Sequence, residues 1–503
     1  MKKALIFFTI LSSIFSVHVF AQKITYSEPD RDDARNMVYD IVGKMNGNII
    51  IYKNNREVHS ISVYDANMKS IDKVRMDYLP DRVFNIDFIQ YPDFFYAIYQ
   101  YQKKNIVYCM AAKLNAQGKI MNDPVQIDTT DINITASNKI YSFVNSEDKQ
   151  KFMLFKINTK NDKVSVVTTL LYDRALALLH KSRLAIPMPE RNDFLAEFQI
   201  DNDGDMACVK EWGTAQNDNI SKLSIITKPA LSDEIKTDDL KINGLYLDDI
   251  RLKVDNFNKH YLVTSFFSKQ RRGNVDCIYL YLWSKDNKKE ILSNTVAFSD
   301  ELRADAKGQG SIKTAFNDYF LRNIIMKKDG GFFIAAESVY TSSRGNAMNR
   351  WDYLGGSPFW TPSDYYMYRS PFYYPGSRFN MYDVTRYFVD NIAVMAFDIN
   401  GKMEWSNVIT KSQYDDNSDH FIGYGLLNTG DQIHFLFNMQ EKRQTIFGDQ
   451  SITPAGQIVR NPVFKNLDKG FDFMAKELKQ VGARQVIVPC QYRNYICFAK
   501  VEL

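Results

Sequence analysis

A short unit that recurs along the whole chain constrains its fold more than any other feature. Each copy is an apolar run, a tight polar turn and a second apolar run, as in "FLAEFQIDNDGDMACVKEW" and "FLRNIIMKKDGGFFIAAES". Alternating apolar residues on both sides of Asn-Gly, Asp-Gly or Gly-Asp predict β-hairpins. Eight such turns occur, centred near Gly47, Asp93, Glu147, Gly204, Asn256, Gly330, Gly430 and Gly482.

A second piece follows the hairpin in seven of the eight units. It is an apolar strand that enters another polar turn, as in "SVYDANMKS" and "AFDINGKME". Each unit therefore predicts a four-stranded antiparallel meander with strands A, B, C and D. Repeated sheets of this kind indicate an all-β fold, a single β-propeller of about eight four-stranded antiparallel blades. Seven blades is the alternative because the unit around Glu147 is weak, and two separate β domains is a lesser one.

The last unit ends with the chain, at "YICFAKVEL", before it has a fourth strand. An isolated strand-like piece, Lys23–Ser27, precedes the first unit. We expect this N-terminal strand to complete the last blade and to close the ring non-covalently, because an open ring would leave strand edges exposed. The alternative is a disordered N-terminus.

Residues 1–21 have the three parts of a secretory signal peptide. A basic start at Lys2 and Lys3 precedes an apolar run that ends in a small-residue cleavage signature at Ala21. We therefore predict an exported protein, in the periplasm or at the cell surface of a Gram-negative bacterium, with the propeller in residues 22–503. An N-terminal membrane anchor is the alternative. No later stretch reaches about 18 apolar residues, so no transmembrane segment is expected once the signal is removed.

The phrases "FDINGKMEWSNVITKSQYDDNSDHFIGYG" and "QIHFLFN" follow a tyrosine-rich stretch. They resemble a group of secreted propeller-like proteins of Gram-negative bacteria. The resemblance is diffuse and extends over most of the chain after residue 21, and its Asp-x-Asn-Gly-Lys turn is common in propellers generally. It implies the fold and export, and it implies no activity for particular residues.

Charge and motifs exclude several functional classes. The chain has 63 Lys and Arg against 59 Asp and Glu, so its net charge is +4, and +2 without Lys2 and Lys3. This balance gives no electrostatic reason to expect nucleic-acid binding. The sequence contains no G-x-S-x-G, H-E-x-x-H or C-x-x-C motif, and its six histidines are widely scattered. We expect no cofactor, and an enzyme is the less favoured interpretation.

The five cysteines do not form a disulfide framework, because they are few in a chain of 503 residues. The favoured interpretation is that the cysteines are small core residues. Cys490 and Cys497 flank "QYRNYI", and a two-residue turn at Arg493 and Asn494 would place them opposite each other as a hydrogen-bonded pair. A disulfide between these two is the alternative.

Two acidic stretches suggest metal binding, but another interpretation is favoured for each. In "DNDGD", Asp201 begins an alternation of carboxylates, yet positions six and twelve of a calcium loop would be Met206 and Trp212, so a plain turn is favoured. The stretch "YDDNSDH" lies in a connection between blades, where carboxylates could bind a hard cation or act as acid and base. A solvated loop is favoured there, and no metal site is predicted. The weak candidate ligands are Asp415, Asp416 and Asp419.

An aromatic-rich insertion at residues 341–389 is the main functional signal. From Asn349 to Phe388, 14 residues are Trp, Tyr or Phe, although aromatic residues make up 14% of the whole chain. The insertion connects strands B and C of the sixth unit, so it shares one face of the ring with the D–A connections. The candidate binding residues are Trp351, Tyr353, Trp360, Tyr365, Tyr366, Tyr368, Arg369, Tyr373, Tyr374 and Arg378.

Trp, Tyr and Arg are the residue types that dominate interface hot spots. The favoured function is therefore an exported, non-enzymatic propeller that acts as a protein-binding scaffold or accessory subunit, with a protein partner in the cell envelope. The alternative is a carbohydrate-binding or carbohydrate-active propeller of the envelope, in which rings stack on a glycan. The rings could also pack on one another as a lid over the central channel. A purely structural module is a further possibility.

Overall fold

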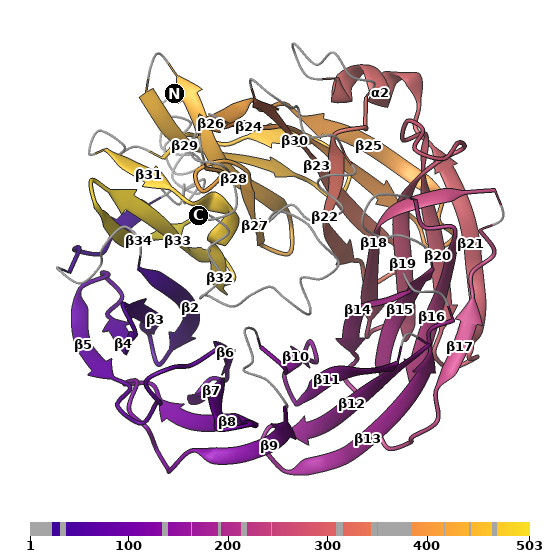
Figure 1. Cartoon of the computed structure of the whole chain (residues 1–503). Helices are drawn as coiled ribbons and strands as arrows, with labels where there is room; N and C mark the ends of the chain where they lie inside the picture. The colour runs from indigo at the N-terminus through magenta and orange to yellow at the C-terminus, as the bar shows by residue number, and fades with distance from the viewer. Residues whose placement is uncertain are drawn as a thin grey trace, which may run out of the picture.

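The structure is a computed structural model that describes most of the sequence after residue 22. The described residues are 23–30, 37–132, 139–161, 163–189, 193–212, 219–242, 244–307, 315–343, 350, 385–416, 418–441, 444–464 and 470–503. Eight antiparallel sheets form a ring around a central axis (Figure 1). The prediction of an all-β propeller with eight blades is confirmed, and the alternatives of seven blades and of two separate domains are wrong.

The first four blades each have four strands in chain order, from the innermost strand A to the outermost strand D. Their strands are β2 (Val38–Met45), β3 (Asn48–Asn55), β4 (Val58–Tyr64) and β5 (Ser70–Arg75); β6 (Asn85–Gln90), β7 (Phe94–Lys103), β8 (Ile106–Asn115) and β9 (Val125–Asp131); β10 (Ser142–Asn145), β11 (Lys151–Asn161), β12 (Val164–Asp173) and β13 (Leu178–Pro187); β14 (Phe194–Ile200), β15 (Met206–Trp212), β16 (Lys222–Lys228) and β17 (Lys236–Asp239).

The other four blades follow the same order, with extra strands in blades 6 and 8. Their strands are β18 (Tyr246–Asp255), β19 (His260–Ser268), β20 (Cys277–Ser284) and β21 (Lys289–Ala297); β22 (Tyr319–Met326), β23 (Phe332–Ser343), β24 (Thr385–Phe397), β25 (Met403–Ile409) and β26 (Gln413–Asp416); β27 (Tyr424–Asn428), β28 (Ile433–Glu441), β29 (Gln444–Ile452) and β30 (Ile458–Arg460); β31 (Phe471–Phe473), β32 (Lys479–Gly482), β33 (Gln485–Tyr492), β34 (Tyr495–Glu502) and β1 (Lys23–Tyr26).

Apolar side chains from neighbouring blades pack against each other around the whole ring. Eight large buried clusters occur among the described residues, one at each boundary between blades. Ile50 and Phe95, for example, belong to the cluster between blades 1 and 2, whereas Ile41 and Phe498 belong to the one between blades 8 and 1. Burying a side chain of this size stabilises a fold by roughly 1.5–3 kcal/mol, so each boundary contributes to stability.

Five of the tight turns share one hydrogen-bonding device. The side-chain oxygen of an Asp or Asn accepts hydrogen bonds from the backbone N–H groups two and four residues later, at 2.8–3.0 Å. This geometry explains why Asp and Asn recur at the start of these turns. The residues are Asp65, Asn115, Asp173, Asp201 and Asp398.

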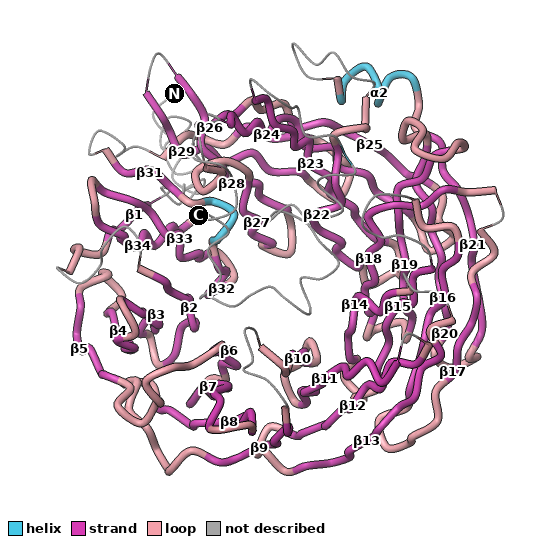
Figure 2. Tube along the Cα trace, in the orientation of Figure 1, coloured by secondary structure: helices cyan, strands magenta, loops and turns pink. Residues whose placement is uncertain are grey.

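The N-terminal strand closes the ring as predicted. Strand β1 pairs antiparallel with β34, with Ile24 opposite Val501, and Figure 2 shows the two side by side. The pairing continues at Ser27, whose N–H donates to the carbonyl of Phe498 at 2.8 Å while its Oγ accepts from the N–H of Phe498 at 2.9 Å. The first and last described strands therefore lie in one blade, where β1 covers the edge of β34.

Cys490 and Cys497 lie opposite each other, as the two-residue turn between them predicts. Cys490 and Cys497 are direct partners on β33 and β34, and both are completely buried. All five cysteines are buried, as expected of small core residues, and the alternative disulfide is not formed in the structure. Residues 1–21, the predicted signal peptide, lie outside the described residues. Among the described residues, no helix has the length and apolar character needed to cross a membrane.

We use the term loop face for the end of the ring that carries the B–C and D–A connections. Its B–C connections are tight in blades 1, 2, 3, 7 and 8 and longest in blades 4, 5 and 6. The D–A connection from blade 5 to blade 6 contains helix α2 (Asp300–Ala306), which lies at the outer edge of the ring (Figure 1). The predicted insertion of 341–389 lies on the loop face and takes in the end of β23, the B–C connection of blade 6 and the start of β24.

The closing strand gives a direct test of ring stability. Replacing Ile24, which is 8% exposed in the cluster between blades 7 and 8, with Ala should lower the free energy of unfolding by about 2 kcal/mol, because apolar burial is lost. Urea unfolding followed by fluorescence measures the change. The matched control is Thr25→Ala on the same strand. Equal effects of the two substitutions would contradict a packing role for β1.

Candidate functional site

Buried charged side chains gather on the loop face where blades 4, 5 and 6 meet. We define the ionic cluster as Glu197, Glu211, Asp248, Asp249, Arg251 and Arg350. Except for Arg251, which retains partial exposure, these side chains are buried. Burying a charge is costly unless an opposite charge or hydrogen bonds compensate for it, so each charged group of the cluster requires such a partner.

Two carboxylates of the cluster project from bulges in the innermost strands. The pairing of β14 shifts between Ala196 and Gln199, and that of β18 shifts between Asp248 and Arg251. The bulges place Glu197 and Asp249 in the left-handed backbone region, with φ of 55° and 49°. Side chains with a Cβ adopt this region at a cost of roughly 1 kcal/mol or more, so something must stabilise it here.

Each of these carboxylates accepts a backbone hydrogen bond from the next blade. The N–H of Leu252 in blade 5 donates to Glu197 Oε2 at 3.0 Å, and the N–H of Leu321 in blade 6 donates to Asp249 Oδ2. Arg251 lies between the two carboxylates, 3.4 Å from Glu197 and 3.2 Å from Asp249. Burial raises the pKa of both carboxyls, and the Arg251 charge opposes that shift. The cluster thus joins three successive blades.

Glu211 is the unusual member of the cluster. It is completely buried near the end of β15, and neither of its carboxyl oxygens has a hydrogen-bond partner among the described residues. Burial, and secondly the charge of Glu197, raise its pKa to about 8. Glu211 therefore holds a proton at neutral pH, which avoids placing another negative charge beside Glu197.

Arg350 connects the insertion to this cluster. It is 8% exposed, and its Nε and Nη2 atoms donate to the two carboxylate oxygens of Asp248 at 2.9 and 2.6 Å. Such two-pronged pairs are short and strong. Arg369 and Arg378 are predicted binding residues and Arg350 is not, because nothing in its sequence context distinguishes a buried arginine from an exposed one.

A second buried ion pair lies beside the cluster in blade 6. Lys411 Nζ is 2.9 Å from Glu337 Oε1, and both side chains are 1% exposed. Lys411 also donates to the carbonyl of Val389 at 3.1 Å and to Gln413 Oε1 at 3.0 Å. Burial lowers the pKa of Lys411, while Glu337 acts to raise it. Lys411 therefore attaches the D–A connection to β23 through Glu337 and to β24 through the carbonyl of Val389.

Strands β23 and β24 extend beyond their blade and carry the insertion. Their pairing continues to Ser343 opposite Thr385, and β26 pairs with the extended part of β24. The insertion predicted over 341–389 is therefore partly strand at both of its ends. The residues between these strands, apart from Arg350, lie outside the described residues. This group contains all the predicted binding residues, which are Trp351, Tyr353, Trp360, Tyr365, Tyr366, Tyr368, Arg369, Tyr373, Tyr374 and Arg378.

A row of aromatic rings crosses this three-stranded extension. Tyr340 and Phe388 are opposite each other and stack with ring centroids 4.8 Å apart, and Phe388 lies opposite Tyr414. The guanidinium of Arg386 lies 4.6 Å from the ring centroid of Tyr414 and forms a two-pronged pair with Asp416, at 2.7 and 3.0 Å. Cross-strand pairs of this kind stabilise a sheet, so they stiffen the extension.

The acidic stretch near residue 416 differs from its prediction. It was expected to be a loop between blades, but its first half forms β26, because the extended part of β24 offers an edge for pairing. Asp416 pairs with Arg386, whose hydrogen bonds lower the pKa of Asp416. Asp415 accepts from Ser418 Oγ at 2.9 Å, and Asp419 pairs with Lys476. Each of the weak metal candidates thus has its own partner.

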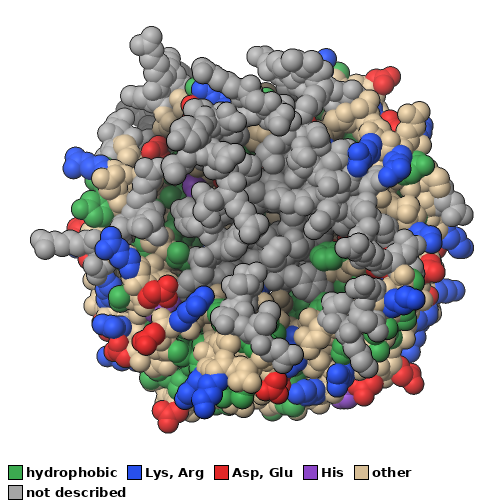
Figure 3. Space-filling view, in the orientation of Figure 1, with side chains coloured by type: hydrophobic (Ala, Val, Ile, Leu, Met, Phe, Trp, Pro, Cys, Tyr) green, Lys and Arg blue, Asp and Glu red, His purple; other side chains and the backbone are tan. Residues whose placement is uncertain are grey.

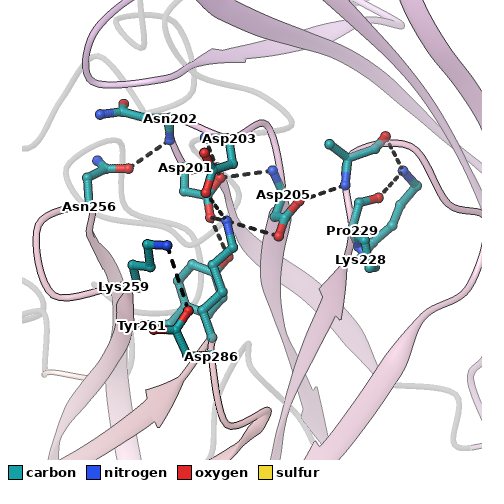
Figure 4. Close-up of polar contacts among 12 residues, drawn as sticks. Asp201, Asn202, Asp203, Asp205, Lys228, Pro229, Asn256, Lys259, Tyr261 and Asp286 are labelled. Carbon is teal, nitrogen blue, oxygen red and sulfur yellow. Dashed lines mark hydrogen bonds and ion pairs between the residues drawn. The ribbon is translucent and has the colours of Figure 1, made fainter.

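The "DNDGD" stretch forms the A–B turn of blade 4, as predicted (Figure 4). Lys285 extends its amine into the turn, where Nζ lies 2.5, 2.7 and 3.0 Å from the carboxylates of Asp201, Asp203 and Asp205. Burial acts to lower the pKa of Lys285, but the hydrogen bonds that its ammonium group donates to these aspartates raise it. A small cavity of about 90 Å³ adjoins this group. A lysine therefore supplies the positive charge here.

The charged groups of the candidate site attach parts of the protein to one another. In the ionic cluster, Asp248 pairs with Arg350 and Arg251 bridges Glu197 and Asp249, so two guanidiniums oppose three carboxylates. Backbone N–H groups donate further hydrogen bonds to the two carboxylates that share Arg251. No group of three or more His, Cys, Asp or Glu with the geometry of a metal site occurs among the described residues. Figure 3 shows basic and acidic side chains interspersed around the rim of the face that it draws.

No model of a protein family and no curated protein sequence matches the chain. Among solved structures, it is similar to prolyl oligopeptidase B from Galerina marginata, with 8% identity and a TM-score of 0.39 over 92% of this chain and 56% of that one. Oligopeptidase B from Leishmania major matches with 9% identity and a TM-score of 0.37, over 83% and 46%. The chain spans about half the length of these peptidases.

A polysaccharide lyase, an ulvan lyase, is similar with 10% identity and a TM-score of 0.36, over 82% of this chain and 90% of that one. At these identities the likeness concerns the fold alone.

Glu211 makes the stability of the ring depend on pH. Its pKa is about 8 in the folded protein and 4.5 in the unfolded chain, so folding binds a proton between these values. The contribution of Glu211 to stability should therefore fall as pH rises from 4.5 to about 8 and stay constant above that. Glu211→Gln removes this dependence, so the variant should gain stability over the parent across this range. Denaturant unfolding at pH 5, 7 and 9 measures the gain. Glu290→Gln, at an exposed position, is the control, and a gain independent of pH would contradict the assignment.

Lys285 should make the "DNDGD" turn insensitive to calcium. Because its ammonium group already lies among the three carboxylates, neither calcium nor EDTA should change the unfolding temperature of the parent. Lys285→Met leaves the carboxylates without their cation, so this variant should be less stable and should regain stability with millimolar calcium. Differential scanning fluorimetry gives both results. A calcium response in the parent would show that the turn is a metal site.

Proposed function

We propose that this protein is an exported, non-enzymatic β-propeller that acts as a protein-binding scaffold or accessory subunit at the periplasm or outer membrane. It binds its protein partner through the aromatic-rich residues inserted between β23 and β24. Export rests on the signal-peptide pattern of residues 1–21. The partner-binding role rests on the position of the insertion and on its composition.

The observation that carries the proposal is the extended hairpin of β23 and β24. Ser343 and Thr385 are paired at its end, and β26 and the row of rings across Tyr340, Phe388 and Tyr414 support it. The aromatic residues are thus inserted at the tip of a supported sheet, on the face with the longest connections. Binding residues that stand on a rigid scaffold bind with a smaller loss of conformational entropy.

The described rings favour a protein partner over a glycan. A sugar stacks on the open face of an aromatic ring, but Tyr340 and Phe388 cover one another and Arg386 covers a face of Tyr414. Tyr414 is 59% exposed beside the Arg386–Asp416 pair, a combination of ring, cation and anion that suits a protein surface. Carbohydrate binding remains the second proposal, distinguished by the experiment below.

A deletion at the tip of the hairpin tests this function. Because Ser343 and Thr385 are direct partners, residues 344–384 can be replaced by Asn-Gly, which forms a two-residue turn. The deletion also removes Arg350, so Asp248→Asn is included to avoid an unpaired buried charge. The variant should keep the far-ultraviolet spectrum of the parent and should lose the protein that the parent retains when crosslinked in native envelopes.

A second variant keeps Arg350 and replaces the eight predicted aromatic binding residues with Ser. It should lose the same protein, because the rings supply the contact area. Phe257→Ser, which removes an exposed side chain at the opposite end of the ring, is the matched control and should leave the crosslink unchanged. Unchanged crosslinking in both loop variants would refute the proposal. Binding to a glycan array that the variants lose would favour the carbohydrate function instead.

A further inference from the structure

The side chain of Arg350 occupies a socket formed by blades 5 and 6. Besides its pair with Asp248, its Nη1 atom donates to the backbone carbonyls of Asn317, at 3.3 Å, and Tyr319. The guanidinium carbon lies 4.6 Å from the ring centroid of Phe320 and 5.6 Å from that of Phe266. The aromatic rings and Asp248 are buried. The socket thus combines an anion, two carbonyls and aromatic rings around one side chain.

This arrangement matches a guanidinium and no other side chain. The Nε and Nη2 edge of a guanidinium presents two parallel donors, which match the two oxygens of Asp248. The remaining Nη1 donors meet the carbonyls, and the flat faces of the group can lie over rings. An ammonium has three donors on one atom and cannot meet a carboxylate and two carbonyls in a plane.

We propose that this socket is a guanidinium-specific binding site and that Arg350, bound in it, is the positioning residue that holds the aromatic-rich segment to the ring. The inference rests on the proposed function, because it assigns a role to Arg350 at the same surface. The segment leaves the ring at Ser343 and returns at Thr385. Arg350 provides a third attachment, on blade 5, which the hairpin alone does not reach.

The first experiment tests the chemistry of the socket. Arg350→Ala should lower the unfolding temperature, and ethylguanidinium at about 10 mM should restore part of the loss, because a ligand that binds only the folded protein stabilises it. Ethylammonium at the same concentration should restore nothing. Recovery with both compounds, or with neither, would overturn the guanidinium-specific site.

The second experiment separates positioning from stability alone. Trypsin cleaves after Arg369 and Arg378, both within the segment, and the cleavage rates at these sites are measured by mass spectrometry. Arg350→Ala should increase these rates several-fold. Ethylguanidinium should restore stability and leave the rates high, because a free guanidinium fills the socket without attaching the chain. If it also returned the rates to those of the parent, or if the rates did not change in Arg350→Ala, the positioning role would be refuted.

Two further variants keep the proposal testable. If Arg350→Ala does not fold, the double variant Asp248→Asn with Arg350→Met removes both charges together. It should show fast cleavage and no stabilisation by ethylguanidinium, and a parent-like cleavage rate would refute positioning. Arg174→Ala is the matched control, since Arg174 also pairs with an aspartate and lies over rings, but at the surface. Arg174→Ala should show neither faster cleavage at Arg369 and Arg378 nor stabilisation by ethylguanidinium. Because no partner is needed, failure here is distinct from failure of the proposed function.

Discussion

Apolar packing between neighbouring sheets is the interaction on which the rest of the structure depends. A blade alone has two apolar faces and can bury neither, so each sheet requires a neighbour on both sides, and a ring satisfies this requirement for all eight. The cluster between blades 8 and 1, with Ile41 and Phe498, completes the ring. Strand β1 adds Ile24 to the cluster beside it and pairs with β34. The hairpins, turns and connections occupy positions that this packing defines.

The ionic cluster shows how polar groups are accommodated within the packed ring. Bulges at Glu197 and Asp249 direct carboxylates to the backbone N–H groups of the next blade, so local strain accompanies hydrogen bonds between blades. Arg251 and Arg350 supply the opposing charges, and Glu211 retains its proton. The same three blades carry the longest B–C connections of the loop face. We therefore regard blades 4–6 as the part of the ring that is adapted to hold the insertion.

Much of the fold could be predicted from the sequence, but little of the site. Alternating apolar residues and Asx-Gly turns are local signals, so the hairpins near Gly47 and Gly330 and the closing strand at Lys23–Ser27 could be recognised. The burial of Arg350 depends on Asp248, about a hundred residues earlier, and the pairing of β26 depends on how far β24 extends beyond its blade. Neither contact leaves a periodic pattern, and so both were missed.

The sequence by itself determined the type of unit, and it indicated about eight blades and the strand that closes the ring, because the side-chain period of two and the turn residues act over a few positions. The structure then excluded seven blades. Only the tertiary structure decided which charges meet. Asp201, Asp203 and Asp205 resemble a calcium loop in sequence, but Lys285 from another turn lies among them. Arg350 resembles the other arginines of its segment, but blades 5 and 6 together form its socket. Electrostatic partners are chosen by distance in space, which a linear pattern does not record.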